Sequence, residues 1–211
     1  MKKIVVAVIA IICFTMCGYE SIDPLDDVLE TGVTIESMVR DLYINHPNAD
    51  YDYVESYVCA KLGKTPDDLV ITKSDYQPSQ VAIDLVKQIS EVDPSSFESK
   101  EEYISCLQLI ANTQKDYLLD GELDAIGVAI TVSAEIIQLK FGEPDTKSFK
   151  EWCKKQWEDW GRCVAGIVGE AGLGAIAGAA LGGIEGCGIG AVPGAIIGGI
   201  CGGLDGASSS C

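Results

Sequence analysis

The residues with the widest chemical scope in this 211-residue chain are its nine cysteines. A thiol can take a lipid, form a disulfide, ligate a metal or attack a substrate, and its spacing and neighbours indicate which. No Cys-x-x-Cys pair occurs, which leaves a zinc ribbon or a thioredoxin-like site without support. The single histidine, His46, excludes a histidine-rich metal site and argues against a histidine-based triad. We also find no phosphate-binding loop and no acid–base pair, and therefore expect no metal, no cofactor and no enzymatic activity.

The first cysteines of the chain lie beside a predicted export signal. Lys2 and Lys3 precede an apolar run at residues 4–14, which is too short to span a membrane and typical of a signal peptide. The sequence from Phe14 to Gly18 resembles a bacterial lipobox, in which the cysteine is lipidated, although Met16 stands where a small residue is usual. We expect residues 1–17 to be a signal peptide, residues 18–33 a tether, and Cys17 either a lipidation site or a neighbour of an ordinary cleavage site.

Charge and apolarity occupy different parts of the chain. The formal charge is −17, yet the mean hydropathy is +0.20. Residues 4–146 contain 26 acids and 8 bases, whereas residues 163–211 contain three acids and no base. The acidic charge argues against a general nucleic-acid binder, which needs a surface of lysines and arginines to contact phosphates. The asymmetry favours a membrane or an assembly partner over a freely soluble enzyme.

Residues 34–146 are predicted to form an acidic α-helical domain. Apolar residues recur there at spacings of three and four, the period of a helix that buries one face. Gly63 and Gly142 are expected to end two of the helices. The tyrosines at positions 43, 51, 53 and 57 are expected to pack at the rim of the core, with a recognition patch as the alternative. The apolar stripes are Ile35, Met38, Val39 and Leu42; Val54, Tyr57, Val58 and Leu62; Val81, Leu85, Ile89 and Val92; Tyr103, Leu107, Ile110 and Ala111; and Leu123, Ile126, Ile130, Ala134, Ile137 and Phe141.

A basic segment containing all three tryptophans, residues 147–162, follows the acidic domain. Tryptophan favours the membrane–water interface, where the ring is buried and the indole N–H stays hydrated. Lysines there extend their ammonium groups toward phosphate headgroups. We expect an interfacial helix, and the alternative is a helix that docks its tryptophan face on the acidic domain. The candidate interface residues are Trp152, Trp157, Trp160, Lys154 and Lys155.

The last 49 residues, 163–211, carry glycine at a strict spacing of four. Small residues at this spacing let two helix backbones approach closely, as they do in membranes. On one straight helix the stripe would drift by about 40° at each step. Two shorter helices remove this conflict, so we predict a hairpin with arms at about residues 164–184 and 192–204. The candidate packing residues are Gly174, Gly178, Gly182, Gly186, Gly190, Gly194, Gly198, Gly202 and Gly206.

The hairpin predicts one disulfide. If the chain turns near Cys187, Cys163 and Cys211 face each other at the open end. Export would permit a bridge between them.

The run from Gly174 to Gly186 resembles the glycine-zipper hairpin of bacterial envelope lipoproteins. The same tail is also similar to two-peptide bacteriocins, whose small-residue zippers form inserted helix pairs. It departs from them because bacteriocin precursors usually have a double-glycine leader and lack an acidic body of this size. The resemblance implies a zipper that inserts into a membrane or oligomerises.

The sequence thus predicts an all-α protein with a small acidic helical body followed by a glycine-zipper hairpin. The first hypothesis is an exported, non-enzymatic protein of the bacterial cell envelope, with an outer-membrane lipoprotein as one form. Membrane lipid and a second copy of the zipper are its expected partners, and the acidic body would face a protein not identified by the sequence. The second hypothesis is a bacteriocin-like or pore-forming antagonistic factor. A soluble protein whose glycine helices pack within a core is the remaining alternative.

Overall fold

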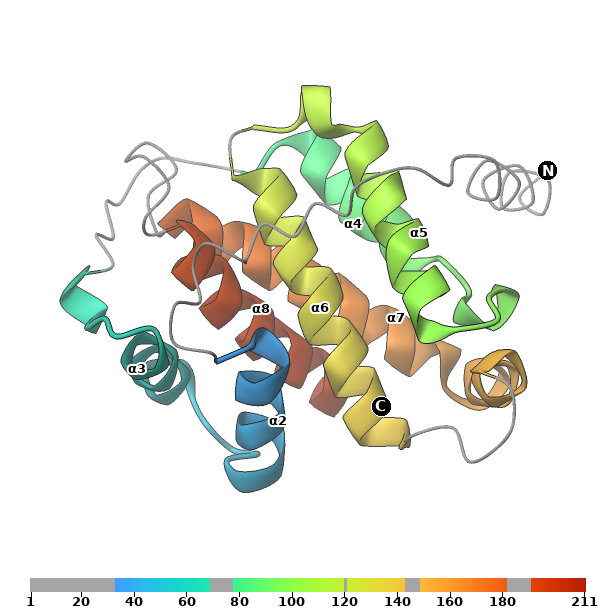
Figure 1. The fold of residues 1–211 in the computed structure, drawn as a ribbon, viewed down its shortest axis with the longest axis horizontal. Helices are drawn as coiled ribbons and strands as arrows, with labels where there is room; N and C mark the ends of the chain where they lie inside the picture. The colour runs from blue at the N-terminus through green and yellow to red at the C-terminus, as the bar shows by residue number, and fades with distance from the viewer. Residues whose placement is uncertain (1–32, 69–77, 120, 143–148, 182–190) are drawn as a thin grey trace.

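The computed structural model describes residues 33–68, 78–119, 121–142, 149–181 and 191–211. Within these ranges the chain forms seven α-helices, labelled α2 to α8, with three short 3-10 helices and no strand (Figure 1). The predicted all-α fold class is confirmed.

The helices α2 (Ile35–Asn45) and α3 (Tyr51–Lys61) begin at polar caps. Thr34 and Ser37 form a reciprocal capping box at the start of α2, and the Asp50 carboxylate accepts from the Tyr53 N–H at the start of α3. All four residues of the predicted α2 stripe are buried. Gly63 follows α3 with a φ of +66°, a backbone conformation that favours glycine.

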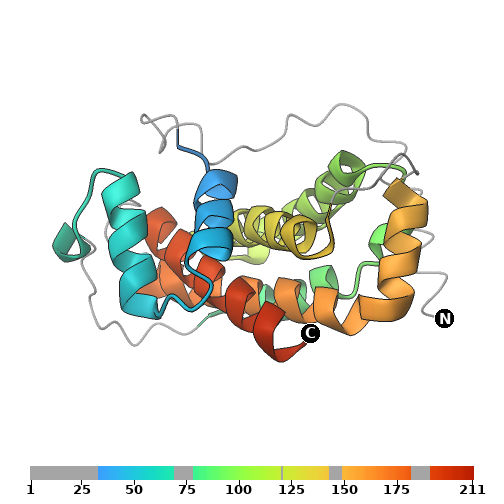
Figure 2. The ribbon, with the colours of Figure 1, turned by 90° about the horizontal axis from the view of Figure 1, so that it is seen from below.

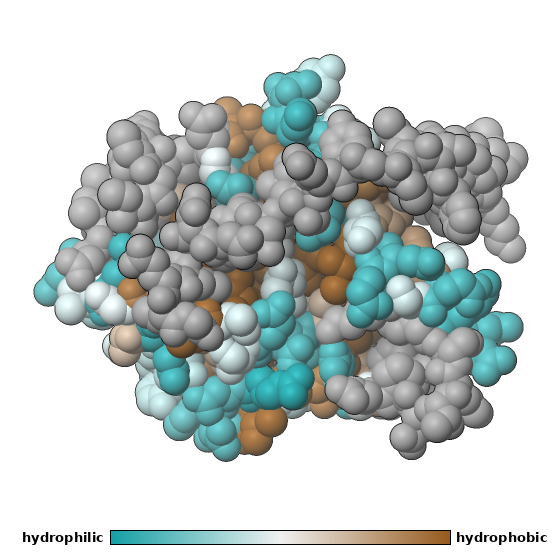
Figure 3. All heavy atoms as spheres, in the orientation of Figure 1, coloured by the Kyte–Doolittle hydropathy of each residue, from teal (hydrophilic) through white to brown (hydrophobic). Residues whose placement is uncertain are grey.

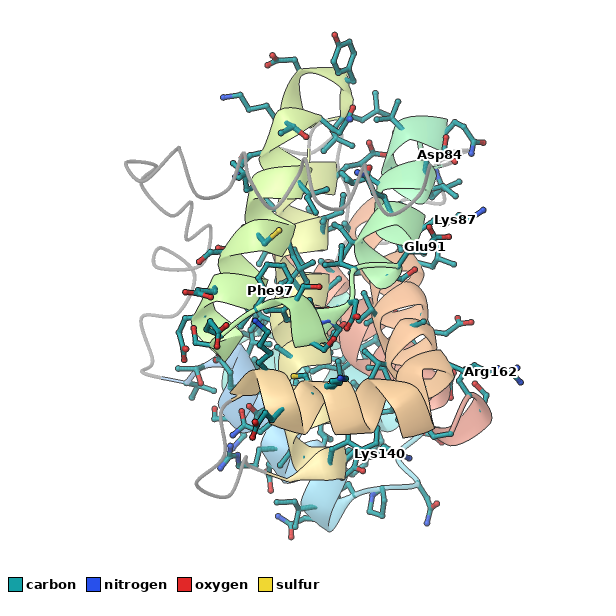
Figure 4. All side chains as sticks on the ribbon, turned by 90° about the vertical axis from the view of Figure 1, so that its right-hand side faces the viewer. Asp84, Lys87, Glu91, Phe97, Lys140 and Arg162 are labelled. Carbon is teal, nitrogen blue, oxygen red and sulfur yellow. A yellow bond between two sulfur atoms is a disulfide. The ribbon has the colours of Figure 1, made fainter. Side chains whose placement is uncertain are left out.

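The helices α4 (Gln80–Ser90) and α5 (Lys100–Thr113) are capped by Ser79 and Ser99. In α4 the buried residues are Ala82, Leu85, Val86 and Ile89, so the stripe is shifted from the predicted one, and Val81 is only partly buried. Asp84, Lys87 and Glu91 point away from the protein on the other face of α4 (Figure 4). The predicted α5 stripe is buried in full.

The central element is α6 (Glu122–Phe141), which crosses the middle of the molecule in yellow in Figure 1. A single stripe was predicted for it, but its buried residues lie on several sides and include Val128, Val132 and Ile136. The reason is that α6 contacts α2, α5, α7 and α8 at once. A helix that packs against others on several sides has no polar, solvent-facing side, so its apolar residues do not recur at one helical spacing.

The C-terminal third forms α7 (Phe149–Leu181) and α8 (Ala191–Ser209). The predicted boundary between residues 162 and 163 lies inside α7, since the basic tryptophan segment and the first hairpin arm are one helix of 33 residues. Figure 2 shows that this helix bends, and Figure 4 labels Arg162 near the bend. One helical glycine costs only about 1 kcal/mol relative to alanine, so Gly161 does not stop the helix.

The hairpin and the body share one hydrophobic core. Helices α7 and α8 pack against each other and against α6, while α3 contacts α8 and α4 contacts α7. Figure 2 shows α2 and α3 over α8 on one side of the molecule, with α4 and α5 on the other. The expected acidic domain, residues 34–146, and the hairpin, residues 163–211, are therefore packed together in this fold.

Candidate functional site: the α7–α8 hairpin

The two hairpin helices meet through their glycines. A side chain added at Gly178 would run into the backbone carbonyl of Gly194, and one added at Gly202 would run into that of Glu170. One at Gly206 would lie 2.7 Å from the carbonyl oxygen of Gly166. Each step of four residues forward along α7 is matched by a step of four backward along α8, so the helices are antiparallel. The glycine spacing read from the sequence is thus used for close packing within one chain.

The open end of the hairpin is closed by a disulfide between Cys163 and Cys211, the pair expected from the sequence. Their Cα atoms are 4.7 Å apart. Next to it, Lys140 at the end of α6 donates from Nζ to the carbonyl oxygen of Ala207 at 2.9 Å. This lysine satisfies a carbonyl in the last turn of α8, where intrahelical partners run out. The end of α8 is therefore fixed to both α7 and α6.

Within the described residues, one helical segment is long and apolar enough by length and composition to cross a membrane. It is Gly161–Ala180 of α7, with a mean hydropathy of 1.6, and 61% of it is buried in this fold. A core helix of a soluble protein passes the same test, so length and composition alone are weak evidence for a membrane span.

The uncovered side of this segment carries both charge and apolar surface. Glu170 and Ala177 are exposed, and Leu173 is 43% exposed near the middle of the segment. A carboxylate at mid-bilayer is costly unless it lies near an end or faces another helix. In this fold Glu170 is exposed at the surface.

The basic tryptophan segment forms the first part of α7. Lys154 is exposed there, whereas the side chains of Trp152, Trp157, Trp160 and Lys155 lie outside the described part of the structure. Lys150 forms an exposed ion pair with Glu98 at 2.7 Å, and α7 contacts the short helix η2 (Pro94–Ser96). Cys153 is buried, and burial, followed by the nearby Asp93, raises the pKa of its thiol to about 12. One face of this segment therefore docks on the body.

Several predicted residues lie outside the described ranges. They are the signal and tether up to residue 32, including Cys17, and the glycines at positions 182, 186 and 190.

Helix α6 carries two buried carboxylates, whose structural roles were not predicted from the sequence. Glu122 is fully buried and accepts from the backbone N–H and hydroxyl of Ser79 at 2.7 and 2.8 Å, and from the N–H of Leu119 at 2.8 Å. Glu135 is 3% exposed and accepts from Arg40. The sequence signal that could have found these two sites is an acidic residue at a position that the apolar pattern predicts to be buried. A carboxylate buried there needs hydrogen-bond or ion-pair partners.

Of the acidic residues beside Gly121, Asp120 lies outside the described residues, and Glu122 turns inward to the start of α4. In the same described residues, no group of three or more His, Cys, Asp or Glu side chains could hold a metal ion.

The face shown in Figure 3 mixes hydrophilic and hydrophobic residues.

Comparison of the chain with known protein families, with curated proteins and with solved structures finds no match. The resemblance to envelope lipoproteins and bacteriocins stays a prediction from the sequence.

Proposed function

We propose that this is an exported, membrane-associated protein of the bacterial cell envelope that acts without catalysis and contacts lipid through its C-terminal hairpin. In this proposal residues 1–16 direct export and are removed, and Cys17, then the first residue of the chain, is the lipid anchor. The acidic body then stands at the membrane surface and faces a protein partner.

The observation that supports this proposal is that the hairpin is complete in itself. Its polar backbone is helical, its glycine face is occupied by its own second arm, and its end is closed by the Cys163–Cys211 disulfide. The sides of the pair that face the body are apolar and include the fully buried Ile176, Ile197 and Ile200, while the charged Glu170 and Asp205 lie on exposed sides. Lipid can replace the body around such a pair, because the pair needs no further hydrogen-bond partners along its length. Self-association through the glycines would require two chains to exchange hairpin arms.

A second candidate, the antagonistic or pore-forming factor, is favoured by the way α2, α3, α4 and α6 cover the hairpin. This arrangement would keep a membrane-active pair soluble until it inserts. The two candidates differ in their effect on a bilayer, since only the antagonist is expected to release a dye trapped in vesicles.

The decisive experiment places a charge on the exposed side of α7. Leu173→Asp should leave the folded protein intact, because Leu173 is 43% exposed. In a lipid-embedded hairpin the same change adds about 2.5–3.5 kcal/mol near the helix centre, beside Glu170. We expect carbonate to release the full-length variant from bacterial membranes while the native protein is retained, in a Cys17→Ser background that removes the anchor.

The matched control is Ile83→Asp, which places the same charge on a residue of α4 that is 36% exposed. It should behave like the native protein. Equal retention of both aspartate variants, or release of the native protein itself, would refute lipid contact through the hairpin.

A further inference from the structure

Helices α2 and α3 form a unit that is tied together by its own polar and aromatic contacts. The Tyr57 hydroxyl donates to Asp41 at 2.5 Å, and the Tyr53 hydroxyl lies 3.1 Å from the ring nitrogens of His46. The rings of Tyr53 and Tyr57 stack with their centroids 6.5 Å apart. Since Asp41 lies in α2, His46 caps the end of α2, and both tyrosines lie in α3, these contacts let the two helices move as one piece.

This unit docks on the rest of the protein through apolar faces and one ion pair whose carboxylate is buried. Helix α2 packs on α6, and α3 packs on α8. From α2, Arg40 donates through Nε and Nη2 to Oε1 of Glu135 in α6, at 2.9 and 2.7 Å. The Glu135 side chain is 3% exposed and that of Arg40 52%. Removing Arg40 would leave the buried Glu135 carboxylate without this compensating charge, so the ion pair fastens the unit to the core.

The surface beneath the unit is the third side of α8. Around that helix, Gly198 faces α7, while Gly199 and Gly203 face Val132 and its neighbours in α6. Successive residues are rotated by about 100°, so Ile197, Ile200 and Leu204 point to the remaining side, toward α2 and α3. Ile197 and Ile200 are fully buried there and Leu204 partly buried.

Free cysteines lie both at the contact between the α2–α3 unit and α8 and in the helices on the other side of the molecule. Helix α3 packs on α8, the helix that carries Cys201. Cys59 is fully buried on α3, and Cys201 is partly exposed. The two other buried cysteines, in α5 and α7, both lie near Tyr103.

We propose that the α2–α3 pair is a lid over α8, fastened by Arg40 and Glu135, and that lifting it uncovers the surface through which the hairpin contacts a lipid bilayer. This inference rests on the proposed membrane function. The glycine contacts and the disulfide lie between α8 and α7, away from the lid. The lid can therefore open while the hairpin stays closed, which presents Ile197 and Ile200 as an apolar stripe of a preformed helix pair.

The test compares alkylation of individual cysteines by N-ethylmaleimide in the full-length native protein and in Arg40→Gln, read by peptide mass spectrometry. Labelling of a buried thiol follows the population of the open form. We expect Cys59 and Cys201 to react about 10–100-fold faster in the variant, because the buried carboxylate of Glu135 has lost its ion-pair partner. Cys106 and Cys153 should keep their native rates, which shows that the rest of the protein stays folded.

Two further variants make the comparison sharp. Lys150→Gln breaks the ion pair to Glu98, in which both side chains are exposed, and should leave all four rates unchanged. Arg40→Lys keeps the charge but loses the two-donor geometry and should give an intermediate rate at Cys59 and Cys201. A uniform acceleration at all four cysteines, or none at any, would overturn the lid.

Flotation with vesicles of phosphatidylethanolamine and phosphatidylglycerol then tests the surface itself. Arg40→Gln should float with the vesicles to a greater extent than the native protein. Selective labelling without greater flotation would leave the lid in place and overturn lipid as its target. Failure of selective labelling would overturn the lid and leave the carbonate test of the proposed function unaffected.

Discussion

Gly174 and Gly198 occupy each other's side-chain space: the position of a Cβ on either residue is filled by the carbonyl oxygen of the other. This reciprocal contact is the closest form of helix packing, and it depends on the absence of both side chains. Four residues along α7, a Cβ on Gly178 would likewise meet the carbonyl oxygen of Gly194. The pairing determines the register of α7 on α8.

Gly198→Ala is therefore expected to destabilise the protein by about 1–3 kcal/mol, because the added methyl group pushes two backbones apart. Gly169→Ala is the matched control, since a Cβ at Gly169 meets nothing within 4 Å. It should be neutral or stabilising by up to about 1 kcal/mol through helix propensity. Urea unfolding followed by circular dichroism measures both, and an unfolding midpoint of Gly198→Ala equal to that of Gly169→Ala would contradict the packing.

Cys211→Ser removes the disulfide while changing an exposed residue. Closing a loop with a sequence separation of 48 contributes about 4 kcal/mol in the chain-entropy model, so we expect a loss of that order. Thermal unfolding with and without reductant is the measurement. The native protein should lose stability on reduction, whereas the variant should show no such response; a variant as stable as the oxidised native protein would argue against the bridge.

Glu122→Gln is expected to cost about 2–3 kcal/mol, because three donors from Ser79 and Leu119 now face a neutral amide in a buried site. Glu101→Gln also changes an acid in the first turn of a helix, but Glu101 is exposed. Its effect should stay within about 0.5 kcal/mol. Chemical denaturation distinguishes the two, and equal midpoints would show that burial of Glu122 carries no energetic weight.

The Tyr57–Asp41 hydrogen bond predicts a pH dependence. The hydrogen bond from Tyr57, followed by that from Asn45, lowers the pKa of Asp41 below 3.8. A depressed carboxyl pKa contributes stability that is present above the unfolded value and lost as pH falls through the folded one. The stability difference between the native protein and Tyr57→Phe should thus be constant near neutral pH and shrink below about pH 4. A difference that stays constant down to pH 2 would exclude the bond as its source.

The body helices could be read from sequence where a helix has one partner side and one solvent side. Ile35, Met38 and Leu42 repeat at helical spacing because the opposite face of α2 is polar. The same reasoning failed for α6, where burial on several sides erases the period. It also placed a boundary after residue 162, which lies inside α7. The helix continues through this point because no proline interrupts it there.

The hairpin shows most clearly which features the sequence could predict and which it could not. Its antiparallel register and the pairing of Cys163 with Cys211 follow from local features, because a spacing of four and one turn restrict which residues can meet. Neither the glycine spacing nor the hydropathy could show what surrounds the helix pair. A helix face buried against protein and a helix face in contact with lipid both need apolar residues.

The sequence by itself determined the helices, their caps and the close approach of the two glycine arms, which depend on residues near each other along the chain. Only the tertiary structure decided that the arms are covered by α2, α3, α4 and α6, and that Arg40 reaches Glu135 across 95 residues. Those contacts join segments that no local pattern relates, and they arise because each buried face and each buried charge needs a partner from elsewhere in the fold.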